Sequence, residues 1–443
     1  MMNNSIDILT DLIAKVRAKG ADSADAVSFS SSDLSVARRF GKPEELERSE
    51  SMSIGLRAFI GKKQAIVSTS DIGNLEELTT RVVDMARVAP EDEFSALANR
   101  DILATEIKDL DSFDATEPSA EEFIKMADKA EETALAYEGI TNSEGADAGY
   151  SSSKITLATS NGFAKSYAQT YFNMSVSVLA GVGQKMERDY EYTVACFLED
   201  LMSPETVGKI AAENTLKRLN PRKVKTCQVP VVFSPRVSKS LVGYFAGSIS
   251  GSKVARKTSF LQEKMGSQLF NPSVNIIDNP HIIRGLSSKP FDAEGVANSK
   301  LELVKDGVLQ TWLLDIRSAN QLGLKTNGCA SRSIASQPSP STSNLYMEAG
   351  DASEAELISD IKNGLYVTET FGMGVNTVSG DYSQGAVGFW IENGQISYPV
   401  SEITIAGNLV DMYGGLTPAN NLEFKYSTNC PTVRIEKMTV AGS

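Results

Sequence analysis

The chain has 443 residues, of which 41% are hydrophobic and 22% charged, and its formal net charge is −13. It exceeds the size at which a single hydrophobic core stops growing, so we expect two domains. The acidic balance and the absence of long Lys/Arg clusters argue against nucleic-acid binding. No apolar run approaches the roughly 20 residues that span a bilayer, and the first 20 residues lack a signal-peptide cleavage site, so we expect no membrane contact and a cytoplasmic location.

Residues 1–220 carry the pattern of an α+β domain. Apolar residues at helical spacing alternate there with segments typical of strands. Ser119 and Glu122 have the spacing of a capping box, and Ser203 precedes a proline as an N-cap would. We expect helices over residues 9–16, 75–85, 120–137 and from 204 to about 219. Strands are expected over 24–42, 51–70 and 138–179, with turns at Gly61-Lys62 and Asn161-Gly162. The segment 89–118 is expected to be an acidic surface connection.

Residues 220–228 are expected to form a linker, because a helix ends there and a strand follows. The part from 228 to 443 is mostly strand and turn, with hairpins predicted at Asp306-Gly307 and Asn393-Gly394. The fold class is therefore α+β in two domains, an α+β N-terminal domain (1–220) and a β-rich C-terminal domain (228–443).

A metal site built by this chain alone is not expected. Catalytic zinc usually has three protein ligands, and the chain has one histidine, His281, between a proline and two isoleucines. The four cysteines are far apart, which indicates free thiols rather than a zinc ribbon or a disulfide framework; they are Cys196, Cys227, Cys329 and Cys430. A site for magnesium or calcium made of carboxylates alone stays open, although no EF-hand loop is present.

Nucleophilic and phosphate-binding motifs are also missing. The sequence has no Gly-x-Ser-x-Gly, and the glycine-rich stretch 372–380 lacks the Lys-Ser/Thr ending of a P-loop. Asp381, Tyr382 and Ser383, which follow it, could line a cleft or belong to an ordinary loop between strands.

A helix is predicted from Ser234-Pro235, a cap followed by a residue with a preset φ. Small residues gather in it: Gly243, Ala246, Gly247 and Ser248. Each interior glycine costs about 1 kcal/mol of helix propensity. Close packing against another backbone is the favoured explanation, and the alternative is the floor of a cleft that an extended peptide can approach.

Four stretches resemble the TldD/PmbA family, and most closely its PmbA (TldE) branch. They are MERDYEYT (186–193), RKTSFL (256–261), PFDAEGV (290–296) and GDYSQGAVGFWIENGQISYPVSEITIAGNL (380–409). The resemblance covers nearly the whole chain and implies a two-subunit metallopeptidase. In that family the TldD-like partner carries zinc on a His-Glu-x-x-x-His segment and a later cysteine, and the complex trims small unfolded peptides, in peptide-antibiotic maturation and antitoxin turnover.

The resemblance also implies that this chain has lost the zinc site. Registering the zinc segment on Arg256-Lys257 and Gly247 places its first histidine at Gly243, its glutamate at Tyr244 and its second histidine at Ser248, and none of these can replace the metal or general-base group. The third-ligand region, 418–429, has no Cys or His, and Cys430 falls just outside it. We therefore expect zinc only in the TldD-like partner. The family's other label, modulator of DNA gyrase, finds no support in the acidic charge.

Three functions remain open. The first is the metal-free subunit of a TldD–TldE peptidase, catalytically inactive when isolated. The second is a metal-independent hydrolase that uses Glu187 or Asp381, with Tyr190, Tyr244 or Tyr382 as proton donor if its pKa were shifted. The third is a non-enzymatic, homodimeric protein that binds or regulates peptides, with edge strands available for an extended peptide.

For the first function, six residues are proposed to face the peptide: Arg188, Tyr190, Arg256, Lys257, Asp381 and Tyr382. Arg256 and Lys257 could pair with a peptide carboxylate or form an internal salt bridge. Glu402 alternates with apolar residues, which places it on an outward or cleft-facing strand position.

Overall fold

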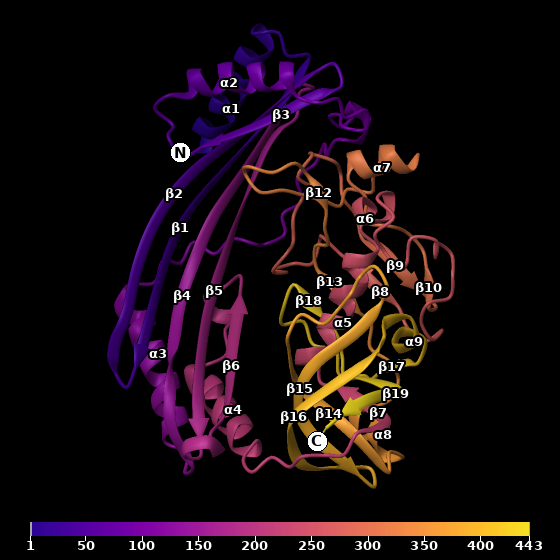
Figure 1. Cartoon of the computed structure of the whole chain (residues 1–443). Helices are drawn as coiled ribbons and strands as arrows, with labels where there is room; N and C mark the ends of the chain where they lie inside the picture. Colours follow the sequence, from indigo (N-terminus) through magenta and orange to yellow (C-terminus); the bar gives the residue numbers. More distant parts are fainter. Residues whose placement is uncertain (1, 443) are drawn as a thin grey trace.

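The computed structural model describes residues 2–442, and side chains from residue 5 onward. The first half is built on one antiparallel sheet of order β3-β2-β1-β4-β5-β6. Four of its strands are 17 to 20 residues long, and they curve together over the second half (Figure 1). The strands are β1 (Ser23–Arg39), β2 (Lys42–Ile60), β3 (Lys63–Thr69), β4 (Ile140–Thr159), β5 (Ala164–Ala180) and β6 (Glu187–Ala195).

Two pairs of helices cover this sheet at opposite ends, and each pair has its own core. Helices α1 (Met2–Ala18) and α2 (Leu75–Val88) pack on β1, β2 and β3, around residues such as Leu12 and Val82. Helices α3 (Ala120–Leu135) and α4 (Pro204–Lys217) pack on β4, β5 and β6, around residues such as Phe123 (Figure 1). The capping box at Ser119 and the N-cap at Ser203 are both confirmed.

The second half contains a mixed six-stranded sheet of order β16-β15-β14-β7-β19-β17, in which β16 also pairs with β19. This extra pairing curls five of the strands into a closed ring, and only β7 and β14 run parallel in it. The strands are β7 (Cys227–Phe233), β14 (Asn363–Phe371), β15 (Asp381–Glu392), β16 (Gln395–Asn408), β17 (Leu416–Pro418) and β19 (Val433–Ala441).

Short elements complete the second half. A five-stranded sheet contains β8 (Ile276–Asp278), β9 (Leu301–Lys305), β10 (Val308–Leu309), β13 (Leu345–Met347) and β18 (Thr428–Asn429), and β11 (Ala330–Ser331) pairs with β12 (Ser339–Pro340). The helices are α5 (Pro235–Ser248), α6 (Gly251–Ala255), α7 (Ile316–Leu322), α8 (Glu354–Ser359) and α9 (Leu409–Gly414). The α+β class is thus confirmed. Within residues 2–442, no helix is both long and apolar enough to cross a bilayer.

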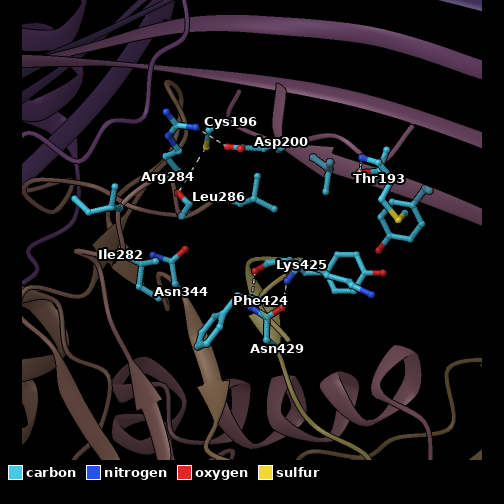
Figure 2. Close-up of a pocket in the computed structure, with 17 residues that line it drawn as sticks. Thr193, Cys196, Asp200, Ile282, Arg284, Leu286, Asn344, Phe424, Lys425 and Asn429 are labelled. Atoms are coloured by element: carbon cyan, nitrogen blue, oxygen red, sulfur yellow. Dashed lines mark hydrogen bonds and ion pairs between the residues drawn. The ribbon is translucent and has the colours of Figure 1, made fainter. Parts of the chain in front are cut away.

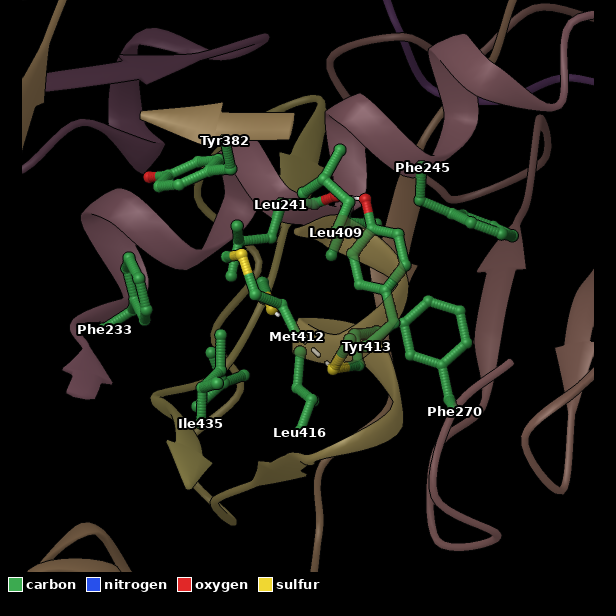
Figure 3. Close-up of a cluster of buried hydrophobic side chains, with 14 of the residues drawn as sticks. Phe233, Leu241, Phe245, Phe270, Tyr382, Leu409, Met412, Tyr413, Leu416 and Ile435 are labelled. Atoms are coloured by element: carbon green, nitrogen blue, oxygen red, sulfur yellow. Dashed lines mark hydrogen bonds between the residues drawn. The ribbon is translucent and has the colours of Figure 1, made fainter. Parts of the chain in front are cut away.

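Helix α5 is anchored in the largest core cluster by its inner face. Phe245 meets Phe270 edge-on, with ring centroids 5.3 Å apart, and Phe270 contacts Tyr413 of α9 at 4.7 Å (Figure 3). The Tyr413 hydroxyl donates to the Leu241 carbonyl oxygen at 3.0 Å, which satisfies a buried polar group. These contacts fix which face of α5 is left for other roles.

Most local predictions are confirmed. All four hairpin turns form, and Asp306, Gly307, Asn393 and Gly394 take the positive φ angles that two-residue hairpins need.

One of these local expectations was wrong, because the Ser234 hydroxyl makes no capping hydrogen bond. The segment 89–118 is a largely exposed connection between α2 and α3, as expected. It also joins the two halves, since Leu103 bridges Val296 and the Arg284 amide donates to the Leu110 carbonyl oxygen.

Candidate functional site

Two cavities lie along the groove between the two halves. One measures about 680 Å³ and the other about 410 Å³, and both are lined by Lys425, Tyr426 and Asn429. Strand β6, the edge strand of the N-terminal sheet, contributes to both walls. In the smaller cavity, Arg284 and Asp200 lie across from the loop that carries Lys425 (Figure 2). The volumes are those of ordinary ligand pockets.

A buried ion-pair cluster holds the larger cavity together. Asp189 of β6, 4% exposed at its side chain, accepts from Arg218 after α4 at 3.0 Å and from Arg236 of α5 at 2.7 Å. Arg218 also reaches Glu369 of β14 at 2.7 Å. One carboxylate therefore ties an N-terminal strand to the first turn of α5.

Aromatic rings and cations lie at and beside the same groove. The Arg236 guanidinium lies 3.7 Å from the Tyr190 ring centre, and the Lys239 ammonium lies 3.4 Å from the Tyr426 ring centre. Lys239 also donates to the Tyr192 hydroxyl at 3.1 Å. Burial, with the charge of Arg236, lowers the pKa of Lys239 to about 8, so this ammonium gives up its proton more easily than an ordinary lysine.

The outward face of α5 continues from this groove. Arg236, Ser240, Gly243 and Gly247 follow one another at spacings of three and four, so they share one helix face. A methyl group built on Gly243 would meet nothing within 4 Å, and one on Gly247 would meet only the Lys253 ammonium, at 3.9 Å. The favoured explanation, close packing of these glycines against a backbone, was therefore wrong, because the face is open.

The three positions registered on the zinc segment do not fit a metal. Gly243 has no side chain, and the Ser248 hydroxyl is buried and donates to the Tyr244 carbonyl oxygen at 2.7 Å. Tyr244 packs edge-on against Tyr382, with centroids 6.3 Å apart. Over residues 2–442 as a whole, no group of three or more His, Cys, Asp or Glu side chains is placed to hold a metal ion.

His281 and Cys430 have structural surroundings. The imidazole Nε2 lies 2.8 Å from the Asn298 amide oxygen and its Nδ1 lies 3.0 Å from the Lys108 ammonium, and burial lowers the His281 pKa. Burial raises the pKa of the Cys430 thiol to about 12, and its sulfur lies 3.9 Å from that of Met347. A thiol in this state is a poor nucleophile.

The six proposed peptide-facing residues occupy separate places. On β6, the Arg188 guanidinium lies 5.5 Å from the Tyr190 ring centre. Its Nε also pairs with a carboxylate oxygen of Glu144, on β4, at 2.6 Å. Tyr382 is 2% exposed and belongs to the core, so it has almost no free surface.

The other three proposed residues are exposed. Arg256 donates from Nε to the Ser252 carbonyl oxygen at 3.0 Å, and Asp381 accepts from the Ser379 hydroxyl at 2.6 Å. Within residues 2–442, neither Arg256 nor Lys257 forms the internal salt bridge considered above. Glu402 is exposed as expected and pairs with Lys223 at 2.9 Å.

Sequence reasoning missed the residues that shape the groove. Asp189 lies inside the family-like stretch 186–193, but its role as the shared partner of two arginines depends on chain segments far apart. Arg236, Lys239 and Tyr426 carry no motif at all. The helical spacing of Arg236 and Gly243 was the available signal, because it places both on one face of α5.

The architecture is that of a two-lobed protein with two cavities along the groove between the lobes, and the described residues contain no group of three or more side chains placed to hold a metal ion. Models of the PmbA/TldA metallopeptidase family match its first domain at residues 24–86, its central domain at 113–219 and its C-terminal domain at 226–442. The metalloprotease PmbA of Escherichia coli O157:H7 is 36% identical over 426 residues, which cover 95% of this chain and 93% of that protein. The chain belongs to the PmbA/TldD family.

Solved structures share the whole fold. A crystal structure of a candidate modulator of DNA gyrase from Bacteroides thetaiotaomicron superposes with a TM-score of 0.92 at 26% identity, covering 100% of this chain and 99% of the other. TldE from Thermococcus kodakarensis superposes with a TM-score of 0.82 at 18% identity, covering 98% of this chain and 99% of the other, which shows likeness of fold.

Proposed function

We propose that this chain is the metal-free subunit of a heteromeric TldD–TldE-type peptidase in the cytoplasm, acting on small unfolded peptides such as antibiotic precursors and antitoxins. The observation that carries the proposal is the helix α5: Gly243, Tyr244 and Ser248 stand where the zinc-binding residues of a TldD-like subunit are registered, and they offer no usable ligand. Zinc then belongs to the TldD-like partner, and this chain supplies the subunit interface and part of the peptide channel.

The open face of α5 gives this role a physical basis. A bare glycine surface beside Lys239 and Arg236 lets a backbone approach closely while cations and rings hold it in place. Such a surface needs no reactive side chain. Arg188, Tyr190, Arg256, Lys257 and Asp381 stay proposed contacts of the peptide or of the partner.

The test compares the isolated chain with its mixture with a TldD-like subunit, on an unstructured fluorogenic peptide with added zinc. We expect cleavage only in the mixture, and comigration of both subunits in size-exclusion chromatography at micromolar concentration. Zinc-dependent cleavage by the isolated chain would overturn the proposal. Metal-independent cleavage by the isolated chain would favour the hydrolase, and absence of a heteromer would favour the homodimeric peptide-binding protein.

A matched pair of variants tests the α5 face itself. Gly243 and Gly414 are both exposed helical glycines with nothing within 4 Å of an added methyl group. Gly243→Trp should lower the activity or assembly of the complex, because the indole covers the open face. Gly414→Trp, on α9, should leave both unchanged. Equal behaviour of the two variants would contradict a functional role of this face.

A further inference from the structure

A smaller cavity of about 260 Å³ lies between the N-terminal sheet and two loops of the second half, and it shares no lining residue with the two groove cavities. Its apolar wall includes Val27, Leu157 and Tyr167 of the long strands. Its other wall comes from the loops that carry Lys289 and Arg332. The first of these loops leads directly into the family-like stretch 290–296.

Arg332 is buried without enough partners. Its side chain is 5% exposed, and one terminal nitrogen donates to Asp25 at 2.7 Å. Its Nε and Nη2 are also buried, and neither finds a hydrogen-bond partner among the residues that the structure describes. Leaving buried donors without a hydrogen bond destabilises the folded state, and more so when the group is charged. A ligand with acceptor oxygens would remove this cost.

The cavity lining itself carries two cations, Lys289 and Arg332, and one carboxylate, Asp292. Asp25 is shared between Arg332 and Arg57, so two guanidiniums have one carboxylate. Lys289 adds a third positive charge, and its ammonium donates to the Ala330 carbonyl oxygen at 3.3 Å.

The Asp292 carboxylate does not compete strongly for these cations. One of its oxygens accepts from the backbone amides of Glu294 and Val296 at 2.9 Å each, and the other accepts from the Ala330 amide at 3.1 Å. Burial raises the pKa of Asp292 to about 6, and burial together with Asp292 raises that of Glu294. The three amide donors already occupy both carboxylate oxygens, so Asp292 has little capacity left to pair with Arg332 or Lys289.

We propose that this cavity is a binding site for a carboxylate with a compact aromatic or branched apolar body. The carboxylate would accept from Arg332 and Lys289, in the charge-assisted geometry that guanidinium groups favour. The body would lie against the strand side chains and Phe291, which already meets Tyr167 edge-on at 5.3 Å. A few placed charges in an otherwise apolar pocket are typical of small-molecule sites.

Two sources share this chemistry: a free small acid, and the C-terminal residue of a peptide. Either would contact both halves of the chain, since Arg332 and Lys289 belong to one half and Val27 and Leu157 to the other. Ligand binding should therefore stabilise the folded protein by RT ln(1 + [L]/Kd). This site does not depend on the peptidase role proposed above.

The test uses the full chain with 3-phenylpropionate and its neutral isostere 3-phenylpropanamide, by isothermal titration calorimetry and thermal unfolding. We expect one molecule of the acid to bind per chain and raise Tm, and the amide to do neither. Lys289→Met should weaken acid binding roughly tenfold, as loss of about 1.4 kcal/mol implies. The exposed Lys300, outside the cavity, provides Lys300→Met as the matched control, which should bind as the parent does.

Hexapeptides ending in phenylalanine, with a free or an amidated C-terminus, distinguish the sources. Tighter binding of the free-acid peptide than of 3-phenylpropionate would assign the site to peptide C-termini, and the reverse would assign it to small acids. The proposal is overturned if acid and amide bind equally, if neither binds at millimolar concentration, or if Lys289→Met binds the acid as well as Lys300→Met does. Absence of binding would mean that ordered water alone satisfies Arg332, and an unaffected Lys289→Met would mean that the acid binds outside this cavity.

Discussion

The Asp189 ion pairs are the sharpest place to test how the two halves are held together. Asp189 lies on β6 of the first half, while Arg236 begins α5 of the second half, and their polar atoms are 2.7 Å apart. Arg218, which follows α4, donates to the other carboxylate oxygen. Replacing the aspartate by its isostere, Asp189→Asn, keeps the volume and removes the charge that both guanidiniums face.

The expected loss follows from burial. The Asp189 and Arg218 side chains are 4% and 7% exposed, and removing one partner of a buried pair costs about 3–5 kcal/mol. Arg218 retains Glu369 at 2.7 Å, which offsets part of the loss. In the described part of the chain, Asp189 is the one ion partner of Arg236 within 4 Å, and the Arg236 Nη2 is already without a hydrogen bond. We therefore expect a loss near the lower end, about 3 kcal/mol.

Urea unfolding followed by two probes measures this effect. Both tryptophans, Trp312 and Trp390, are buried in the second half, so their fluorescence reports that half, whereas far-UV circular dichroism reports both. Asp189→Asn should lower the stability and separate the two transitions, because the halves lose their shared carboxylate.

The matched control is Glu144→Gln, which removes the exposed pair with Arg188, 46% and 45% exposed. It should cost at most about 1 kcal/mol. If Asp189→Asn lowers the free energy of unfolding no more than this control does, the buried ion pairs do not hold the two halves together.

Two further predictions concern glycines and pH. Gly243→Ala should raise the free energy of unfolding by about 0.5–1 kcal/mol, because the added methyl group enters open space. Gly55→Ala should lower the free energy of unfolding, because its methyl group would overlap the Ile334 carbonyl oxygen. Urea titration of both variants checks these opposite signs. Burial raises the pKa of Asp292 from 3.8 to about 6, so its contribution is complete below the unfolded pKa and is lost as pH rises through the folded one. Between about pH 4 and pH 6 the parent should therefore lose stability relative to Asp292→Asn, and parallel pH profiles of the two proteins in urea unfolding would contradict this.

Local chemistry made much of the fold predictable. A capping box such as Ser119 with Glu122 acts within one helical turn, and a hairpin such as Asn393-Gly394 depends on two consecutive φ angles. The alignment of the zinc segment with Gly243 and Ser248 also depended only on the spacing of residues along the chain. Such signals are complete within a few residues, so one sequence is enough to see them.

The groove could not be predicted in this way. Asp189 meets Arg236 across 47 positions of the chain, and Arg332 meets Asp25 across 307, and each carboxylate is shared between two arginines. Ser234 has the sequence signature of an N-cap, yet its hydroxyl makes no capping bond, because tertiary position rather than local pattern decides where it points. Burial and pairing of charges are properties of the assembled halves.

The glycines of α5 show why stability alone does not explain this helix. Alanine would fit at Gly243 without contact and would stabilise the helix by about 0.5–1 kcal/mol, so the glycine carries an avoidable cost. Packing does not require it, since an added methyl group there meets no neighbour. Such a loss of helix stability is expected where a surface must stay free of side chains so that another chain can approach, because proteins commonly sacrifice stability at functional surfaces. The inner face of α5, fixed by Phe245 and Tyr413, then keeps that bare surface in place.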